Sequence, residues 1–148
     1  MDDCHAWMVS FRGGHRAAVG ELELVHVIPD TPPLFPIMKA PSHCRQVFLW
    51  EGRVLPLFDV PSWLGEQAST VGNDHVGVFR YRCAPGEPLG YGAMIIEGAP
   101  RQVLVDDSQA CALPDDAEAW RPLVNACFEY GGHAVPVLNL ARVFDTPL

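Results

Sequence analysis

The chain has 148 residues, 49% of them hydrophobic, and its ten Lys and Arg against eighteen Asp and Glu give a formal net charge of −8. This length suits one ordinary domain with its own core, and the scattered basic residues exclude the usual electrostatic footprint of a nucleic-acid or anionic-membrane binder. No apolar stretch reaches the roughly 20 residues of a membrane span, and the acidic start lacks the basic region of a secretory signal, so we expect a cytoplasmic protein without direct membrane insertion.

The N-terminal elements read as strands. Apolar alternation over residues 5–12 predicts a strand, the glycine pair at 13–14 predicts a turn, and a second strand is expected from about Arg16. The next segment, ELELVHVI at 21–28, has an apolar spacing that suits either an extended strand or one helical turn. The pattern alone leaves both possibilities open.

A proline-rich stretch follows at residues 29–42. It contains five prolines and has no apolar period, which predicts a loop laid over the surface. We expect Leu34, Phe35 and Ile37 to pin this loop to the molecule.

The middle of the chain predicts a hairpin and a short helix. The runs CRQVFLWE and GRVLPLFDV are rich in β-forming residues and are separated by a Glu-Gly turn, which favours an antiparallel hairpin. Asp59 then suits the N-cap of a helix VPSWLG, in which Pro61 occupies the first turn at no hydrogen-bonding cost. The polar stretch at 66–74 is the best candidate for a boundary between two halves.

The second half of the chain also consists of short strand-like runs separated by turn residues. Three strands at meander spacing are predicted, then a helical turn within an acidic irregular stretch, then a hairpin around the glycine pair at 131–132, and finally a short helix. The corresponding segments are HVGVFRYR, LGYGAMIIEG and PRQVLV, then PDDAEAW, then VNACFEY and HAVPVLNL, and NLARVF.

The two hairpins match each other at an offset of 80 residues. The matching pairs are Trp50 with Tyr130, Gly52 with Gly132, Leu55 with Val135, Pro56 with Pro136, Asp59 with Asn139 and Val60 with Leu140. Such a run indicates a supersecondary unit used twice: a strand, a glycine turn, a return strand containing proline, and an Asp or Asn before a helical turn. Proline is tolerated where a bulge or an edge has released the N–H, so we expect the return strand to bend there.

Four blocks of the sequence carry a wider pattern: AVGELELVHVIP, CRQVFLWEGRVLPLFDVPSWLG, GYGAMIIEGAPRQVLV and ACFEYGGHAVPVLNLARVF. Through these blocks the sequence resembles the CheW-like domain family over nearly the whole chain, and the most specific part is GRVLPLFDVPSWLG within the second block. This resemblance implies an all-β fold of two SH3-like five-stranded β-barrels packed side by side, with short helical turns. We expect a single domain whose first subdomain spans about 5–65, with the C-terminal helix at 140–148 packing back on it, and whose second subdomain spans about 74–139.

The resemblance implies a non-catalytic adaptor that couples chemoreceptors, or a chemosensory-like system such as type IV pilus control, to a CheA-type histidine kinase. The implied partners are the kinase regulatory domain and the receptor's cytoplasmic tip, and no cofactor is expected. The implied protein-binding residues are Val25, Ile28, Gln46, Leu49, Trp50, Glu51, Gly52 and Gly92. Among the tryptophans, Trp50 is the one expected to be exposed as an interface anchor.

One departure from the family pattern concerns the receptor. Glu51 stands where the family has an arginine that helps to dock the receptor tip. An anion in place of a cation reverses the electrostatic preference of a docking point, so we expect receptor binding to differ from the usual manner.

The alternative function is a small cytoplasmic thiol enzyme or hydrolase that uses a cysteine. Five cysteines, an odd number spread along the chain without a CxxC pair, fit reduced thiols. The adjacent pairs Cys4-His5 and His43-Cys44 do not have the usual spacing of metal ligands. In addition, neighbours in a strand point to opposite faces and could not hold one ion together. We therefore expect no metal site and no catalytic residues, and GxSxG-type nucleophile motifs are missing from the sequence.

Overall fold

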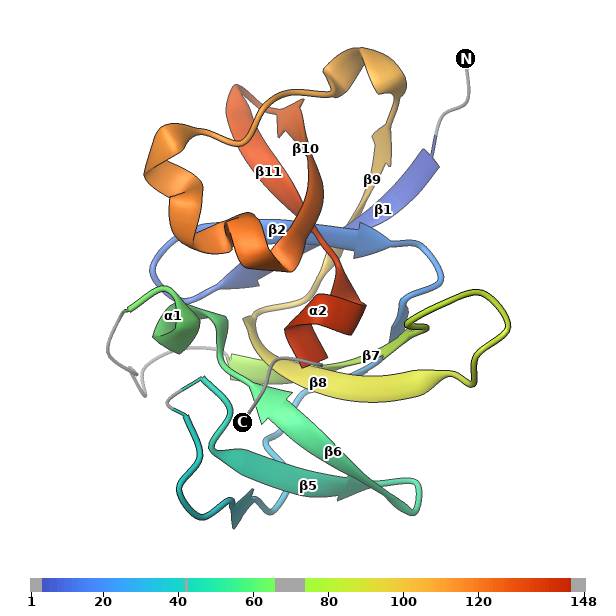
Figure 1. Cartoon of the computed structure of the whole chain (residues 1–148), viewed down its shortest axis with the longest axis vertical. Helices are drawn as coiled ribbons and strands as arrows, with labels where there is room; N and C mark the ends of the chain where they lie inside the picture. The colour runs from blue at the N-terminus through green and yellow to red at the C-terminus, as the bar shows by residue number, and fades with distance from the viewer. Residues whose placement is uncertain (1–3, 42, 66–73, 145–148) are drawn as a thin grey trace.

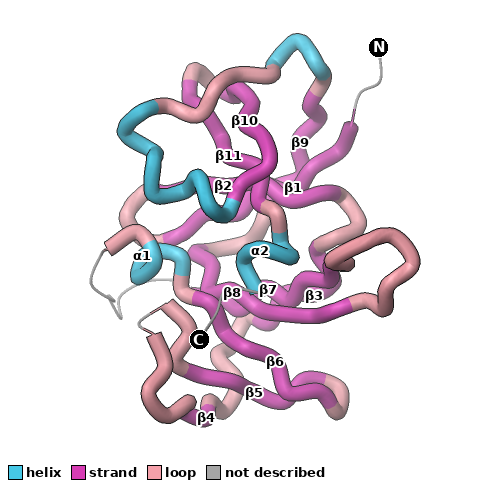
Figure 2. The backbone as a smooth tube through the Cα atoms, viewed as in Figure 1, coloured by secondary structure: helices cyan, strands magenta, loops and turns pink. Residues whose placement is uncertain are grey.

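The computed structural model describes residues 4–41, 43–65 and 74–144, which form two β-sheets and several short helical segments (Figure 1). Strands dominate and helical segments are brief (Figure 2). The strands are β1 (Cys4–Phe11), β2 (His15–Gly20), β3 (Leu24–Ile28), β4 (Phe35–Pro36), β5 (Gln46–Trp50), β6 (Arg53–Phe58), β7 (Asp74–Tyr81), β8 (Gly90–Glu97), β9 (Arg101–Val105), β10 (Val124–Tyr130) and β11 (His133–Leu138). The helical segments are α1 (Val60–Trp63), α2 (Leu140–Phe144) and the 3₁₀ helices η1 (Asp107–Gln109) and η2 (Asp115–Leu123).

Each sheet combines strands from both halves of the chain. Sheet A has the order β10-β11-β2-β1-β9, and sheet B has the order β3-β7-β8-β6-β5-β4. The five strands of sheet A correspond to five of the six strands of sheet B. In this correspondence β10, β11, β2, β1 and β9 of sheet A occupy the places of β5, β6, β8, β7 and β3 in sheet B. The duplicated unit is therefore present, and the two copies exchange strands reciprocally.

This exchange differs from two expectations based on sequence. The division into consecutive parts, 5–65 and 74–139, does not follow the sheets, because β1 and β2 pair with the C-terminal strands. The expected meander also stops early, because β9 pairs antiparallel with β1 and not with β8. The candidate boundary at 66–74 lies outside the described residues apart from Asp74, where β7 begins.

Two corners carry the chain from one sheet to the other. After β8 the chain turns at Gly98, whose φ is 69°, and passes Pro100 before β9 joins sheet A. After β2 it turns at Gly20, whose N–H donates a hydrogen bond of 2.7 Å to the Glu23 carboxylate, and β3 joins sheet B. The segment at 21–28 that suited either strand or helix is thus extended over Leu24–Ile28.

The two prolines of the repeat occupy equivalent places in the two hairpins. Pro56 lies opposite Val47, and Pro136 lies opposite Cys127. The β5–β6 register passes through Pro56 without a bulge, and parallel pairing with β8 begins only at the next residue, Leu57. The side of β6 at Pro56 is therefore not paired with β8, and the missing N–H is tolerated there. Of the two possibilities expected from the sequence, a bulge or an edge, the structure has the edge.

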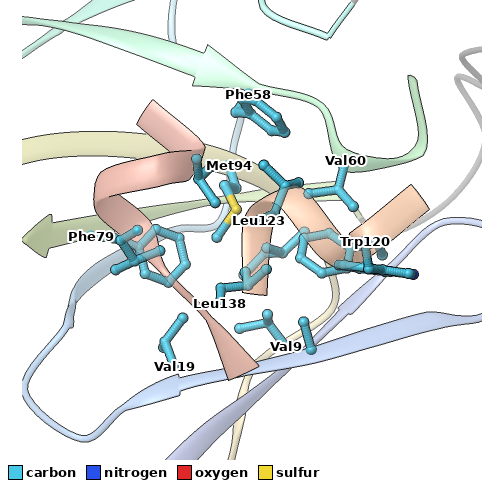
Figure 3. Close-up of a cluster of buried hydrophobic side chains, with 14 of the residues drawn as sticks. Val9, Val19, Phe58, Val60, Phe79, Met94, Trp120, Leu123 and Leu138 are labelled. Carbon is cyan, nitrogen blue, oxygen red and sulfur yellow. The ribbon is translucent and has the colours of Figure 1, made fainter. Parts of the chain in front are cut away.

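The main core lies between the sheets and is shared by both copies of the unit. Val9 and Val19 come from sheet A, Phe58 and Met94 from sheet B, and Trp120 from η2, and all five are buried (Figure 3). Helix α2 contacts β6, β7 and η2, so it packs on strands from both halves. The described helices include none that is long and apolar enough to cross a membrane.

Candidate functional site

The hairpin of β5 and β6 presents an apolar surface on the outside of sheet B. On its inner face, Phe48 lies opposite Leu55, and both are buried. On the outer face, Leu49 lies opposite Val54, and these side chains are 62% and 63% exposed. Directly opposite residues in an antiparallel pair share a face, so Leu49 and Val54 form one exposed apolar pair.

The apolar surface continues toward the edge of the sheet. Residues two apart in a strand share a face, so Val47 lies on the same side as Leu49. Val47 is opposite Pro56 on β6 and opposite Phe35 on β4, and the Phe35 side chain is 51% exposed. We call the resulting surface the outer patch; its residues are Phe35, Val47, Leu49, Val54 and Pro56. Contiguous exposed apolar side chains at a sheet edge are typical of a protein-docking surface.

The hairpin turn places a charge at the tip of this surface. Glu51 and Gly52 have φ values of 47° and 77°, the pattern of a type I′ turn with both central residues in the left-handed region. The matching turn in the second copy has Gly131 and Gly132, with φ values of 60° and 80°. Glu51 is therefore an exposed carboxylate at a backbone position where the other copy uses glycine.

Trp50 is packed against the barrel and is not an exposed anchor. Its ring lies 5.9 Å from that of Tyr91, between centroids, and the side chain is half-buried. The Arg53 guanidinium covers the same tyrosine at 4.3 Å from the ring centroid, a cation–π contact. These contacts pack the base of the turn against β8, and the large exposed apolar side chain of β5 is Leu49 and not Trp50.

The structure brings together five of the eight residues expected at the binding surface: Gln46, Leu49, Trp50, Glu51 and Gly52 all lie on β5 or its turn. The other three lie elsewhere, on β3 and β8. Val25 is 40% exposed on β3, at the other end of the strand order of sheet B, and Ile28 packs on the core of that barrel.

Gly92 on β8 is buried beneath helix α2. A Cβ at this position would stand 2.4 Å from the ring of Phe144, so the glycine is required for close packing. Its role in the described structure is to seat α2, and it offers no surface to a partner.

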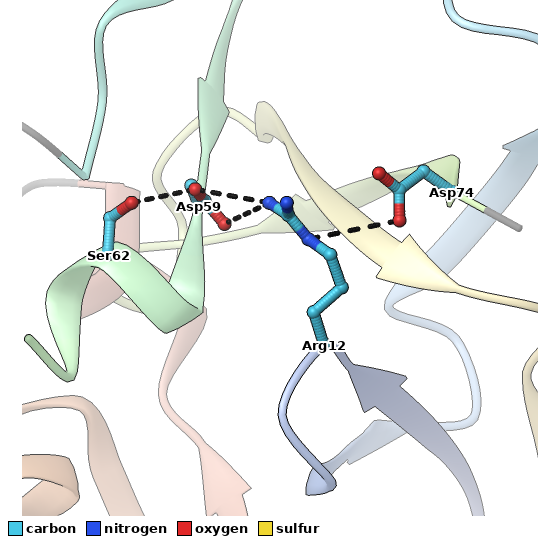
Figure 4. Close-up of polar contacts among 4 residues, drawn as sticks. All are labelled: Arg12, Asp59, Ser62 and Asp74. Atoms are coloured by element: carbon cyan, nitrogen blue, oxygen red, sulfur yellow. Dashed lines mark hydrogen bonds and ion pairs between the residues drawn. The ribbon is translucent and has the colours of Figure 1, made fainter. Parts of the chain in front are cut away.

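A cluster of charged residues joins the two sheets near α1. The Arg12 guanidinium, in the β1–β2 turn, lies 3.3 Å and 3.4 Å from the two oxygens of Asp59 (Figure 4). Its Nε is 3.9 Å from Asp74, an ion pair too long to be a hydrogen bond. Asp59 is the N-cap residue of α1 as expected, but its carboxylate accepts a 2.7 Å hydrogen bond from the Ser62 hydroxyl and none from the helix backbone. This cluster holds the outer hairpin against sheet A.

A separate cavity of about 620 Å³ opens on the sheet A side. It lies between the β1–β2 turn, η2 and the β10–β11 hairpin, and its wall includes His15, Asp116, Trp120 and His133. It is distinct from the outer patch in every lining residue.

Two of the cysteine thiols have pKa values shifted away from those of a catalytic nucleophile. Burial raises the pKa of Cys44, and burial together with the interaction between the Cys111 and Cys127 thiols raises the pKa of Cys127 to about 12. A catalytic cysteine requires the opposite shift, because the thiolate is the attacking species. Among the described residues, no group of three or more His, Cys, Asp or Glu side chains is placed to hold a metal ion.

Sequence reasoning missed most of the outer patch. The sequence predicts that Phe35 pins the loop at 29–42, but Phe35 forms the two-residue strand β4 with its side chain 51% exposed, and no sequence signal points to Val54 alone. The signal was nevertheless in the hairpin: once the turn is fixed at Glu51 and Gly52, the register makes Leu49 face Val54.

Comparison with known proteins agrees with this architecture. The sequence matches the family model for the CheW-like domain over residues 8–147. The fold is similar to the crystal structure of the scaffolding protein TtCheW from Thermoanaerobacter tengcongensis, with a TM-score of 0.74, 11% sequence identity, and coverage of 93% of this chain and 90% of that chain. No curated protein matches the sequence. The mainly β fold with two SH3-like subdomains, expected from the sequence, is confirmed.

Proposed function

The chain belongs to the CheW-like domain family, and on that basis we propose that it is a non-catalytic cytoplasmic adaptor that binds the regulatory domain of a CheA-type histidine kinase. The observation that carries the proposal is the outer patch on β4, β5 and β6. The structurally similar TtCheW is a scaffolding protein, which supports an adaptor role.

The outer patch has the properties of a docking surface for another β-rich domain. Phe35, Leu49 and Val54 are each more than half exposed, although they are apolar. Fully burying one such side chain stabilises a contact by about 1.5–3 kcal/mol before the costs of association. The patch ends at β4, a strand of only two residues. Such a short edge strand offers few free backbone groups to an added strand, so a partner would contact mainly the apolar side chains.

Glu51 sets the electrostatic preference at the tip of the hairpin. It replaces the family's receptor-docking arginine, and its side chain is exposed at the end of the same hairpin. We infer that a receptor or other input protein meets this tip with a basic surface, because opposite charges steer association and like charges oppose it. The upstream system is a chemoreceptor array or a chemosensory-like system such as type IV pilus control.

The proposal is tested by titrating the purified chain with the regulatory domain of a CheA-type histidine kinase from the same organism. Leu49→Glu should raise the Kd at least about tenfold, equivalent to about 1.4 kcal/mol, because it places a charge in the apolar contact. Leu104→Glu is the matched control: Leu104 is 52% exposed on β9 of sheet A, away from the patch. Its Kd should stay within about twofold of the wild type.

Two results would overturn the proposal. If the wild-type chain shows no association with the regulatory domain at any accessible concentration, the kinase is not its partner. Equal weakening by the two glutamate variants would show that the effect comes from added charge and not from the outer patch.

A further inference from the structure

Two cysteines face each other across a pair of neighbouring segments in sheet A. The sulfurs of Cys111 and Cys127 are 3.4 Å apart, with the Cys111 thiol directed at that of Cys127. Cys127 lies on β10, and Cys111 lies in the irregular segment between η1 and η2. Neither has a role in the outer patch or in the Arg12 cluster.

The backbone holds the two cysteines in register. Ala110 forms an antiparallel bridge with Phe128, and the Cys111 N–H donates a 3.0 Å hydrogen bond to the Cys127 carbonyl. The two cysteines are therefore directly opposite residues. Directly opposite residues of an antiparallel pair have Cα atoms about 4.5–5.5 Å apart, which lies inside the range of about 4.4–6.8 Å that disulfides span.

We propose that Cys111 and Cys127 are a reversible disulfide site whose oxidant is a hydroperoxide, and that the bond fastens the segment 106–123 to β10. The sulfurs must approach from 3.4 Å to about 2.05 Å, a movement of about 1.4 Å that side-chain rotation and a small backbone shift supply. Transient disulfides of this kind are the form in which cytosolic proteins use such pairs for sensing.

The reaction balances without any further reagent. The Cys111 sulfur attacks the hydroperoxide, whose O–O bond breaks, giving a sulfenic acid on Cys111 and an alcohol, or water when the oxidant is hydrogen peroxide. The Cys127 sulfur then attacks the Cys111 sulfur, the S–O bond breaks, and the hydroxyl leaves as water with the Cys127 proton. Two electrons pass from the two thiols to the hydroperoxide. A low-molecular-weight dithiol returns both thiols by exchange and is itself oxidised to a disulfide.

The order of the two steps follows from exposure. Cys111 is half-buried and meets solvent first, whereas the Cys127 side chain is only 6% exposed. Burial and the contact with Cys111 also raise the pKa of Cys127, which disfavours its direct reaction with a hydroperoxide, because the thiolate is the attacking species. Cys127 is thus the resolving thiol.

Closing the disulfide constrains the segment 106–123, which contributes both to the core and to the cavity wall. Trp120 and Leu123 of η2 belong to the core between the sheets. Leu113, Asp116 and Trp120 also line the cavity on the sheet A side. The disulfide anchors the start of this segment, so oxidation should rigidify one wall of the cavity.

The test uses the full chain carrying Cys4→Ser and Cys83→Ser, which remove the two exposed thiols. The protein is treated with hydrogen peroxide, quenched with catalase, denatured, alkylated with N-ethylmaleimide and digested with glutamyl endopeptidase. Cleavage after Glu118 separates the two cysteines, whereas trypsin fails there because Arg121 precedes Pro122. We expect a cross-linked pair of peptides that dithiothreitol separates, and slower amide hydrogen exchange at 110–113 in the oxidised protein.

Three cysteines provide the controls. Cys127→Ser should leave Cys111 as a sulfenic acid that dimedone traps, and Cys111→Ser should leave Cys127 alkylatable. Cys44 is also 6% exposed, makes no sulfur contact with another cysteine in the described part of the chain, and should stay reduced. The proposal is overturned if no cross-linked peptide forms, whether both thiols remain free or Cys111 proceeds alone to sulfinic acid, or if exchange at 110–113 is unchanged by oxidation.

Discussion

At the scale of single residues, Glu51 is the position where local stability and surface chemistry conflict. Its φ of 47° is in the left-handed region, which costs a non-glycine residue about 1–2 kcal/mol. The equivalent residue of the second hairpin, Gly131, adopts a similar φ of 60° without that penalty. A strained, charged and exposed residue at the tip of a candidate docking surface is consistent with a role in recognition.

The left-handed backbone at position 51 predicts how substitution there changes stability. Glu51→Asn should raise the free energy of unfolding by about 0.5–1 kcal/mol, because Asn tolerates the left-handed region and Asn-Gly is the preferred type I′ pair. The reciprocal change, Gly131→Glu, should lower it by a similar amount. Urea unfolding followed by tryptophan fluorescence measures both. A less stable Glu51→Asn variant, or an unaffected Gly131→Glu variant, would contradict the assigned turn.

At the scale of elements, helix α2 depends on the missing side chain of Gly92. The Phe144 ring lies against β8 there and is held in place by Tyr81, with ring centroids 5.5 Å apart, and by Phe58 at 6.5 Å. The ring has little freedom to retreat from an added methyl group. Close helix–strand contact, and not partner binding, explains this glycine.

Gly92→Ala should therefore destabilise the protein by about 1–3 kcal/mol, the usual cost of overpacking. The midpoint of urea unfolding should fall while the slope stays constant, since the folded state keeps its surface. In a Phe144→Leu background the same substitution should cost clearly less. If the two substitutions are additive, the contact between Gly92 and α2 is not the cause.

The hairpins show which elements sequence alone can predict. Local signals were sufficient for β5 and β6, because the Glu-Gly turn and the flanking apolar runs lie within twelve residues of one another. They were also sufficient for the second copy around Gly131 and Gly132. They predicted the strand β9 but not its partner, because a hairpin turn and a corner that leaves the sheet have the same length, and only the free edge at β1 decides between them.

At the scale of the whole molecule, the defining feature is the reciprocal exchange of strands between two copies of one unit. The repeat at an offset of 80 residues predicted two related halves, and the structure confirms a duplication. The exchange itself left no local trace, because Ala18 of β2 and Ala93 of β8 pair in parallel with the hairpin of the other unit over only one or two residues. Such long-range pairing is set by tertiary packing.

The same exchange leaves the outer patch at one end of sheet B, where we propose that the kinase regulatory domain docks. Amide hydrogen exchange of the chain alone and in complex with that domain tests this docking site. We expect slower exchange at residues 35–36 and 46–58 in the complex, with little change in β9 and β10. Protection confined to sheet A, or no protection in a complex that forms, would contradict the proposed docking site.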